Sequence, residues 1–531
     1  MDDGIATDDC RLSEFLAALS LATDLGLGQP MEHVLRSCVI GAQLSEAADL
    51  SDQVRAAVCS VGLLAWVGCI ADSHEIAAAF GDDVRFRADS HEVDLAGFPL
   101  AAFVIGHAGA GGSPWHRGWL AATSLIAGRE GLARSIRSHC ETTGSLAGRL
   151  GLGPEVCVPL LHVFERWDGK GLPGGLKGEQ ADVVARVVTM AGILEVFERI
   201  GGQDGALEVA RRRRGKQFDP HLVDCFSRDP GGVLVGSVET LNIEAVFEAC
   251  PALGRRLSGN ELDTVLEAVA DFTDLKSPSA LGHSRGVADL AAEAAQLIGL
   301  GDSEVVQLRR AALVHDLGQQ GISSAIWDKP AALTTAERER VRLHPYLVER
   351  ILAGSSVLAP LGALASLHHE RLDGSGYPRG ITGAGLSPSA RVLATADAYH
   401  ALVEPRPHRD AQAPEEAARE MRSEARAGRL DPAAVDAVLA AAGHRVGRRR
   451  PWPDELTARE VEILVLVARA HTSRAIAQRL HITEKTVGNH IEHIYSKIGC
   501  TSRAGAALYA MQHGLLTQVQ SEREEAIRYM G

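Results

Sequence analysis

The residues of this chain best suited to chemistry are histidines and aspartates between positions 283 and 397. In chain order they are His283, His315, Asp316, His344, His368, His369 and Asp397. Imidazole nitrogens bind iron, manganese or zinc, and a carboxylate can bridge two such ions. Two ions a few ångströms apart can hold a hydroxide and clamp a phosphodiester. The set therefore predicts a centre of two divalent metal ions (Fe, Mn or Zn) that hydrolyses a phosphate ester.

The local sequence indicates that this centre is buried. His315 and Asp316 follow the apolar run 311–314, which reads AALV and favours a buried helix. A carboxylate in such a place is costly unless it is paired or bound to a metal. A single histidine is more often an ordinary core residue, but several ligand-type residues in one segment favour a metal site.

The elements that must position these side chains are predicted to be helices. Apolar residues recur at three- and four-residue spacing through most of the chain, so we expect an all-α fold. A length of 531 residues predicts several domains. The net charge of −14 excludes a generally basic nucleic-acid-binding protein, so any DNA contact must come from a local surface.

The chain is expected to be cytoplasmic, without membrane contact. Its nine scattered cysteines form no C-x-x-C pair, which argues for a reducing compartment. The acidic N-terminus lacks the order of a signal peptide. Residues 56–71 are an uncharged run of 16, shorter than the roughly 20 needed to span a bilayer. We predict a buried core helix there.

The chain also repeats itself. Residues 165–173 (ERWDGKGLP) match residues 370–378 (ERLDGSGYP) 205 positions later, and His139 matches His344 at the same offset. His33 matches His283 at an offset of 250, so the first copy holds an insertion between Trp66 and His139. A duplicated domain is therefore predicted.

The first copy has lost the metal ligands. In the same register, Ala65 and Trp66 stand where the second copy has His315 and Asp316, and Gly192 stands at the position of Asp397. Val163 and Phe164 replace the adjacent histidines, so His33 and His139 alone are retained. Two imidazoles without a carboxylate cannot hold a two-ion centre. The first copy is predicted to be catalytically inactive, either as a packing partner or as a site for a regulatory ligand.

The second copy resembles the HD-GYP family of HD-superfamily phosphohydrolases, through its HDxG, HP, HHE, DGSGYP and AD motifs over about 261–445. The resemblance implies a helical domain that hydrolyses cyclic di-GMP. It assigns one ion to His283, His315, Asp316 and Asp397, and the other to Asp316, His344, His368 and His369. The substrate site it implies consists of Asp316, Gln319, Asp373, Gly376, Tyr377, Pro378 and Arg406.

Several positions depart from that family. Gln319 replaces the usual Lys after HDxG, which removes a cation near the substrate phosphate. His400 stands where a second Asp is frequent, and Ser279 replaces the Glu of three-ion members. We therefore expect two ions, an intact metal site and an altered substrate site.

The C-terminal module has a helix-turn-helix pattern. Thr457 and Glu460 fit a capping box, residues 473–480 form a second short helix, and a third helix begins at Thr483. The second helix of such a pair can enter a major groove. The motifs LTxRE, IAxxL, TVxxH and KIGCTSR resemble the LuxR-type DNA-binding domain over about 454–515. The resemblance implies DNA contacts by Ser473, Arg474, Lys485, Thr486, Asn489, His490 and Lys497.

Charge in this module is nearly balanced. Residues 454–514 hold seven Arg or Lys against six Asp or Glu, and Gly488 replaces a usual Lys. A homodimer is therefore expected, because two half-sites double the phosphate contacts. A helical protein-interaction module is the alternative.

Together these patterns predict five segments. They are a degenerate HD-GYP-like domain (1–235), a metal-dependent HD-GYP-like domain (236–446), a linker (447–453), a LuxR-type module (454–515) and a charged tail (516–531). The predicted function is a bacterial transcription regulator with a cyclic-dinucleotide phosphodiesterase core acting on double-stranded promoter DNA. Two alternatives stay open: a core that senses nucleotide without hydrolysis, and a phosphohydrolase for another nucleotide.

Overall fold

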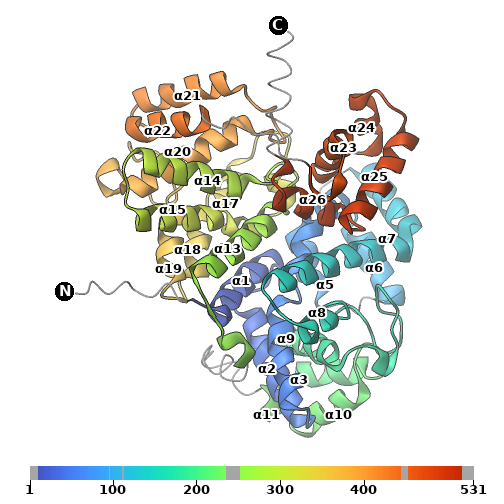
Figure 1. Cartoon of the computed structure of the whole chain (residues 1–531). Coiled ribbons are helices and arrows are strands. Elements are labelled where there is room, and N and C mark those ends of the chain that lie inside the picture. The colour runs from blue at the N-terminus through green and yellow to red at the C-terminus, as the bar shows by residue number, and fades with distance from the viewer. Residues whose placement is uncertain (1–9, 95, 110–112, 235–250, 444–451, 517–531) are drawn as a thin grey trace, which may run out of the picture. The chain divides into compact units, whose positions relative to one another are not determined.

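The computed structural model describes residues 10–94, 96–109, 113–234, 251–443 and 452–516. Helices make up nearly all of their regular structure (Figure 1), which confirms the all-α prediction. The chain divides into two compact units, here called unit 1 (Met1–Val265) and unit 2 (Leu266–Gly531). The predicted domain boundary at 235/236, most of the linker and the tail from 517 onward lie outside the described residues.

Unit 1 contains the two described strands, β1 (Cys10–Arg11) and β2 (Arg256–Leu257), which pair antiparallel. Its helices are α1 (Leu12–Gly26), α2 (His33–Ala47), α3 (Asp52–Leu64), η1 (Val67–Asp72), α4 (Ser73–Phe80), α5 (Asp83–Ser90), α6 (Gly97–His107), α7 (Pro114–Arg149), α8 (Pro154–Leu160), η2 (Gly178–Gln180), α9 (Val183–Arg213), α10 (Pro220–Arg228), α11 (Pro230–Leu234) and η3 (Pro251–Gly254). The region between Trp66 and His139, where the first copy is longer, contains η1, α4, α5, α6 and the first part of α7.

Unit 2 begins within α13 (Gly259–Asp274) and continues through the predicted metal-binding segment. The following helices are α14 (His283–Leu297), α15 (Asp302–Val314), η4 (Leu317–Gly321), α16 (Ser324–Trp327), α17 (Thr335–Val341), α18 (His344–Leu352), α19 (Leu358–Ala365), η5 (Gly383–Gly385), α20 (Pro388–Val403), α21 (Pro414–Arg426) and α22 (Pro432–Gly443). The core helix α14 packs against α15, α20 and α22.

The same elements recur in both units. Helices α2 and α14 both have 15 residues, and α3 and α15 both have 13; each pair begins 250 positions apart. The short helices η2 and η5 begin 205 positions apart. Bridges Asp168↔Lys177 and Asp373↔Thr382 close equivalent loops. Each offset equals the one read from the sequence.

Two equivalent glycines, Gly68 and Gly318, make the same close backbone contact in the two units. A Cβ at Gly68 would lie 2.3 Å from the carbonyl oxygen of His139, and a Cβ at Gly318 would lie 2.1 Å from that of His344. A Cβ at either position would clash with the carbonyl oxygen, because the close-packed core has no space for another carbon atom. The glycine of the HDxG motif is therefore required by packing, with or without metal ligands beside it.

The apolar run of unit 1 is interrupted. Among the described residues, one stretch, Asp52–Phe80, is long and apolar enough by composition to cross a membrane, and 67% of its apolar window is buried. It consists of α3, η1 and α4 rather than one continuous α-helix. Helix α3 is buried from Ala57 to Leu64, which confirms the predicted core helix for the first part of 56–71, whereas the second part belongs to η1.

The C-terminal module consists of η6 (Pro453–Glu455), α23 (Ala458–Ala468), α24 (Ser473–Leu480), α25 (Glu484–Ile498) and α26 (Arg503–Gln512). Threonine hydroxyls cap α23, α24 and α25, satisfying backbone N–H groups that the first turn leaves free. The predicted capping box of Thr457 and Glu460 is confirmed. Ile463, Ile476, Val487 and Ile494 are buried in its core.

Candidate metal centre and helix-turn-helix module

Five helices of unit 2 bring the seven predicted ligands together. His283 begins α14, His315 and Asp316 follow α15, His344 begins α18, and Asp397 lies in α20. The pair His368 and His369 follows α19. All are buried except His369, which is half-buried.

Asp316 stands between two pairs of imidazoles. Its Oδ2 lies 3.8 Å from His283 Nε2 and 3.5 Å from His315 Nε2. Its Oδ1 lies 3.3 Å from His344 Nε2 and 3.7 Å from His368 Nε2. Each oxygen thus faces a different pair, as a carboxylate bridging two cations requires.

Asp397 is the second carboxylate of the cluster. Its Oδ1 lies 3.3 Å from His283 Nε2 and 3.9 Å from His315 Nε2. Its Oδ2 lies 3.5 Å from Nδ1 of His369. The predicted ligands are therefore close neighbours in space, although they span more than a hundred positions of sequence.

Hydrogen bonds fix the tautomer of three rings. Nδ1 of His315, His344 and His368 lies 2.7, 2.6 and 2.7 Å from a backbone carbonyl oxygen, so each Nδ1 carries the proton. Each Nε2 is then a bare lone pair. Those of His344 and His368 face each other at 2.9 Å, and that of His315 is buried without a hydrogen-bond partner.

Converging lone pairs repel one another unless a cation lies between them. This donor set therefore fits divalent metal ions. Burial lowers the pKa of His368 to about 3 and that of His369 well below its usual value. Both rings are consequently neutral at pH 7, which is the form that binds metal.

Glu404 contacts the ring nitrogen of His283 that faces away from the two aspartates, and the sequence analysis did not predict it. Its Oε2 accepts a hydrogen bond from Nδ1 of His283 at 2.8 Å, which turns Nε2 toward the two aspartates. Burial would lower the pKa of His283, but Glu404 and Asp397 outweigh it and raise that pKa. The signal was available, because Asp397, His400 and Glu404 are spaced three and four residues apart on one helix face.

His400 occupies room left by a glycine. A Cβ at Gly286 in α14 would lie 1.9 Å from Nε2 of His400 in α20. His400 Nδ1 lies 3.1 Å from Glu404 Oε1. His400, which departs from the HD-GYP pattern, therefore contacts Glu404, the carboxylate that orients His283.

Four of the predicted substrate residues, Asp373, Gly376, Tyr377 and Pro378, lie in the loop between α19 and η5. The Tyr377 ring lies against that of His369, tilted by 35° with centroids 4.6 Å apart, and Tyr377 is followed by Pro378 through a cis peptide bond. Asp373 accepts hydrogen bonds from the backbone N–H and hydroxyl of Ser375, so it closes its own loop. A Cβ at Gly376 would lie 2.4 Å from the backbone nitrogen of Arg371.

Gln319, Arg406 and Glu370 are also placed by the structure. Gln319 is fully buried, and its Nε2 lies 3.5 Å from the Thr273 carbonyl oxygen. Arg406 lies beside Glu404, with Nη2 3.4 Å from Oε2. Glu370 of the HHE motif accepts hydrogen bonds from Arg379 and Ile381 backbone N–H groups and thereby holds the loop.

Aromatic rings fill the equivalent place in unit 1. Trp66 packs on Phe164 at 5.6 Å, and Phe164 packs on His139 at 4.8 Å. His91 of the insertion adds a ring 5.7 Å from that of His33, whose Nδ1 contacts the carboxylate of Glu195. The described residues there supply neither an aspartate pair nor the converging lone pairs of unit 2.

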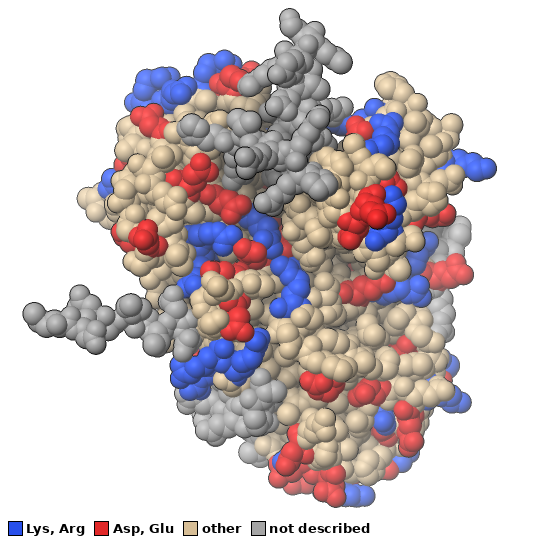
Figure 2. All heavy atoms as spheres, in the orientation of Figure 1, with Lys and Arg blue, Asp and Glu red and all other residues tan. Residues whose placement is uncertain are grey.

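The predicted DNA-contact residues lie mainly on the surface of their module. Ser473, Arg474, Lys485 and Asn489 are exposed, and Thr486 and His490 are half-buried. Lys497 is engaged: its Nζ donates to the Glu460 carboxylate at 2.8 Å and to the Glu455 carbonyl at 3.1 Å. On the face of this module that Figure 2 shows, basic and acidic side chains are interspersed.

Comparison with known proteins agrees with this class of fold and site, an HD domain followed by a helix-turn-helix. Residues 267–434 match the HD domain family, and residues 454–510 match the bacterial regulatory proteins of the luxR family. The chain is 31% identical over 411 residues to 3'3'-cGAMP-specific phosphodiesterase 3 of Vibrio cholerae, covering 77% of this chain and 89% of that protein.

Other relatives cover less. A cyclic di-GMP phosphodiesterase of Thermotoga maritima is 36% identical over 182 residues, 34% of this chain and 48% of that protein. A crystal structure of the Vibrio cholerae cyclic GMP-AMP specific phosphodiesterase V-cGAP3 matches with a TM-score of 0.57 and 27% identity, covering 85% of this chain and all of that one. The chain belongs to the HD-domain family that contains these phosphodiesterases. The resemblances to HD-GYP and LuxR-type proteins are thereby confirmed.

Proposed function

We propose that unit 2 hydrolyses a phosphodiester bond of a cyclic dinucleotide, cyclic di-GMP or 3'3'-cGAMP, with two ions of iron, manganese or zinc. The observation that carries the proposal is the convergence of the Nε2 lone pairs of His315, His344 and His368 on the Asp316 carboxylate, with Asp397 beside His315. The substrate class is drawn from the relatives, which cleave cyclic dinucleotides.

The ligand assignment follows the two faces of Asp316. His283, His315 and Asp397 would hold one ion with Asp316, while His344, His368 and His369 would hold the other with it. When bound, the ions supply Lewis acidity at phosphoryl oxygens and lower the pKa of a water. Glu404 keeps His283 oriented through its Nδ1. Arg342, whose guanidinium lies 5.0 Å from the Tyr377 ring, offers a cation at the edge of the site.

One observation favours a second function. Gln319 is buried against Thr273 and offers no cation to a substrate phosphate. Loss of positive charge where negative charge develops slows phosphoryl chemistry. A core that binds a cyclic dinucleotide without cleaving it is therefore the alternative.

A hydrolysis assay with the purified full chain distinguishes a phosphodiesterase from a core that only binds the nucleotide. The protein is loaded with Mn²⁺ or Fe²⁺, incubated with cyclic di-GMP or 3'3'-cGAMP, and the products are separated by chromatography. We expect a linear dinucleotide from the wild-type chain and none from Asp316→Ala. His493→Ala, which removes an exposed imidazole of the C-terminal module, should behave as wild type. Binding of both nucleotides without any linear product would leave the sensor alternative.

We further propose that the helix-turn-helix module binds double-stranded promoter DNA as part of a homodimer. The luxR-family match and the exposure of Arg474, Lys485 and Asn489 support this. Coupling between nucleotide and DNA would be reciprocal by linkage. Selection from random duplexes at low salt tests it, and a dimer predicts two related half-sites. Enrichment of no sequence at all would contradict the proposal.

A further inference from the structure

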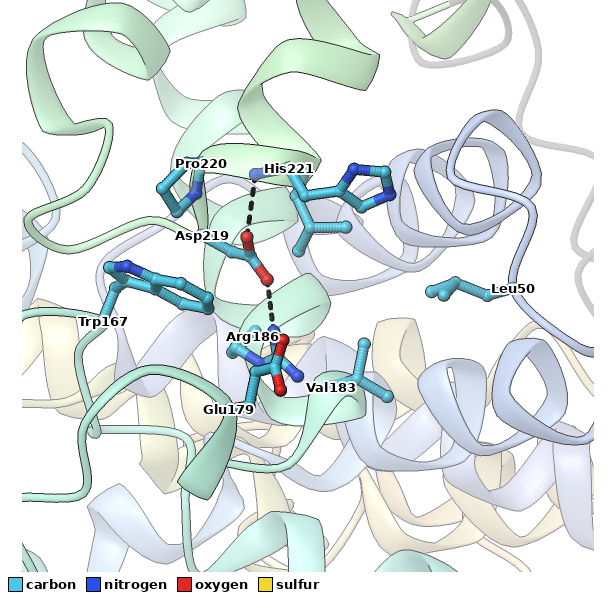
Figure 3. Close-up of a pocket in the computed structure, with 9 residues that line it drawn as sticks. Leu50, Trp167, Glu179, Val183, Arg186, Asp219, Pro220 and His221 are labelled. Atoms are coloured by element: carbon cyan, nitrogen blue, oxygen red, sulfur yellow. Dashed lines mark hydrogen bonds and ion pairs between the residues drawn. The ribbon is translucent and has the colours of Figure 1, made fainter.

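Unit 1 contains a pocket of about 380 Å³ whose lining does not include the aromatic cluster of Trp66, Phe164 and His139. It is formed where the loop after α2, the segment around η2, the start of α9 and the start of α10 meet (Figure 3). Its size falls within the range of small-molecule sites, about 300–1,000 Å³. The chemistry of its lining decides what it can bind.

An ion pair forms one wall of this pocket. Arg186 of α9 contacts the carboxylate of Asp219, which also accepts the backbone N–H of His221 at 2.8 Å (Figure 3). Unit 2 has the same pair, with Arg391 Nη1 3.0 Å from Asp431 Oδ2. Because both units have it, the pair belongs to the shared fold and does not by itself indicate a ligand.

Three other lining side chains are particular to unit 1. Trp167, Glu179 and His221 stand in register with Leu372, Ala384 and Ala433 of unit 2. An indole, a carboxylate and an imidazole thus surround the ion pair in one unit, where the other has three aliphatic side chains. The unit that lacks the metal ligands is the one equipped for polar recognition here.

The arrangement suits a flat, nitrogen-rich ring. Trp167 offers a stacking surface, and the Arg186 guanidinium lies 5.5 Å from the centroid of its ring. Leu50 and Val183 supply apolar surface on the other side of the pocket (Figure 3). Glu179 is exposed at the rim, so its carboxylate is free to accept N–H donors from a ligand. Arg186 Nε is buried without a hydrogen-bond partner.

We infer that this pocket binds a guanine base, stacked on Trp167 with its adjacent ring and amino N–H donors on Glu179. Guanine also offers O6 and N7 as acceptors, the atoms that arginine prefers. Adenine lacks the paired donors, so Glu179 would discriminate against it. The base can come from a guanine mononucleotide or from a guanine-containing cyclic dinucleotide.

The test is calorimetric titration of the full chain after removal of divalent ions, with GMP, AMP and cyclic di-GMP as probes. Without divalent ions no hydrolysis occurs, so the result does not depend on the function proposed for unit 2. We expect GMP to bind at least about tenfold more tightly than AMP. Tighter binding of cyclic di-GMP than of GMP would identify the dinucleotide as the source of the base, and the reverse order a mononucleotide.

Two substitutions that introduce the residues of unit 2 test whether GMP binds in this pocket. Trp167→Leu should weaken GMP binding about tenfold, in line with the ~1–3 kcal/mol of a base–aromatic stack. Glu179→Ala should abolish the preference for GMP over AMP. Trp115→Leu and Glu208→Ala, at exposed positions of unit 1 outside the pocket, should change neither. Absence of GMP binding at millimolar concentration, or unchanged affinity in both pocket variants, would overturn the inference.

Discussion

The protonation of single imidazole rings decides what unit 2 can bind. Because His315, His344 and His368 each donate Nδ1–H to a carbonyl, their Nε2 atoms can serve only as acceptors. The ligand types could be predicted from sequence, since histidine and aspartate in this order have few other uses. The tautomers could not, because they depend on carbonyl oxygens that only the folded helix ends bring near. Glu404 was missed for a related reason: its contact with Nδ1 of His283 depends on how α14 and α20 pack.

Glu404 provides the sharpest single-residue prediction. Glu404→Gln should lower metal affinity by about 10–100-fold, since partners that orient a ligand contribute about this much. Affinity is measured by competition with a zinc-binding chelator dye. Glu416→Gln, an exposed carboxylate in α21, is the matched control. Equal affinity in the wild-type and Glu404→Gln proteins would show that the His283 contact is unimportant for metal binding.

Two lysines of the C-terminal module should behave differently. Lys485 is exposed, whereas Lys497 is held by Glu460 and Glu455. Lys485→Ala should weaken DNA binding on all sequences and reduce the slope of log affinity against log salt by about 1. Fluorescence anisotropy over a salt series measures this, with Lys177→Ala of unit 1 as control. A slope unchanged from wild type would exclude Lys485 from phosphate contact.

At the scale of elements, close glycine contacts hold the scaffold together. Sequence could not separate the glycines of HDxG and DGSGYP into structural and catalytic ones. The structure can, because Gly68 and Gly171 of unit 1 make the same approaches as Gly318 and Gly376, although unit 1 has other residues at the positions of the histidine pair and of Asp316. These glycines therefore serve the packing of η4 and of the loop before η5.

Gly318→Ala should accordingly destabilise unit 2 by about 1–3 kcal/mol, the usual cost of an overpacked core position. Gly354→Ala is the control, since nothing lies within 4 Å of the Cβ that it would add. Denaturant unfolding followed by circular dichroism measures both. If the two variants were equally stable, the 2.1 Å approach to the His344 carbonyl would not constrain the fold.

The capping box of α23 makes the C-terminal module sensitive to acid. Burial would raise the pKa of Glu460, but the Lys497 ammonium and the Thr457 donors outweigh it and lower that pKa to about 2. A carboxyl whose pKa falls on folding stabilises the fold above its unfolded pKa, about 4.3, and this contribution disappears as the pH falls toward 2.

Glu460→Gln should therefore cost about 1 kcal/mol at pH 7 and make stability less dependent on pH between about 4.3 and 2. Thermal unfolding of the full chain across this range, with Glu484→Gln as control, measures the effect. A wild-type pH profile in Glu460→Gln would contradict the role given to this carboxylate.

At the scale of the whole molecule, the chain combines two helical units, whose helices recur at constant offsets, with a helix-turn-helix module. The repeat could be predicted because motif offsets of 250 and 205 survive in the sequence. The aromatic filling of unit 1 could be anticipated from Trp66 and Phe164, but the arrival of His91 from the insertion could not, since no repeat position corresponds to it. Nor did the sequence reveal the pocket around Trp167, whose lining comes from four separate segments.

The measurement that tests the account most directly is elemental analysis of the full chain, purified without chelators and after reconstitution with Fe²⁺, Mn²⁺ or Zn²⁺. We predict two ions per chain, with little or no metal in the His315→Ala/Asp316→Ala double variant. His33→Ala in unit 1 should keep the wild-type content. If no ion co-purifies or can be restored, or if the double variant retains both, unit 2 does not contain the proposed metal centre.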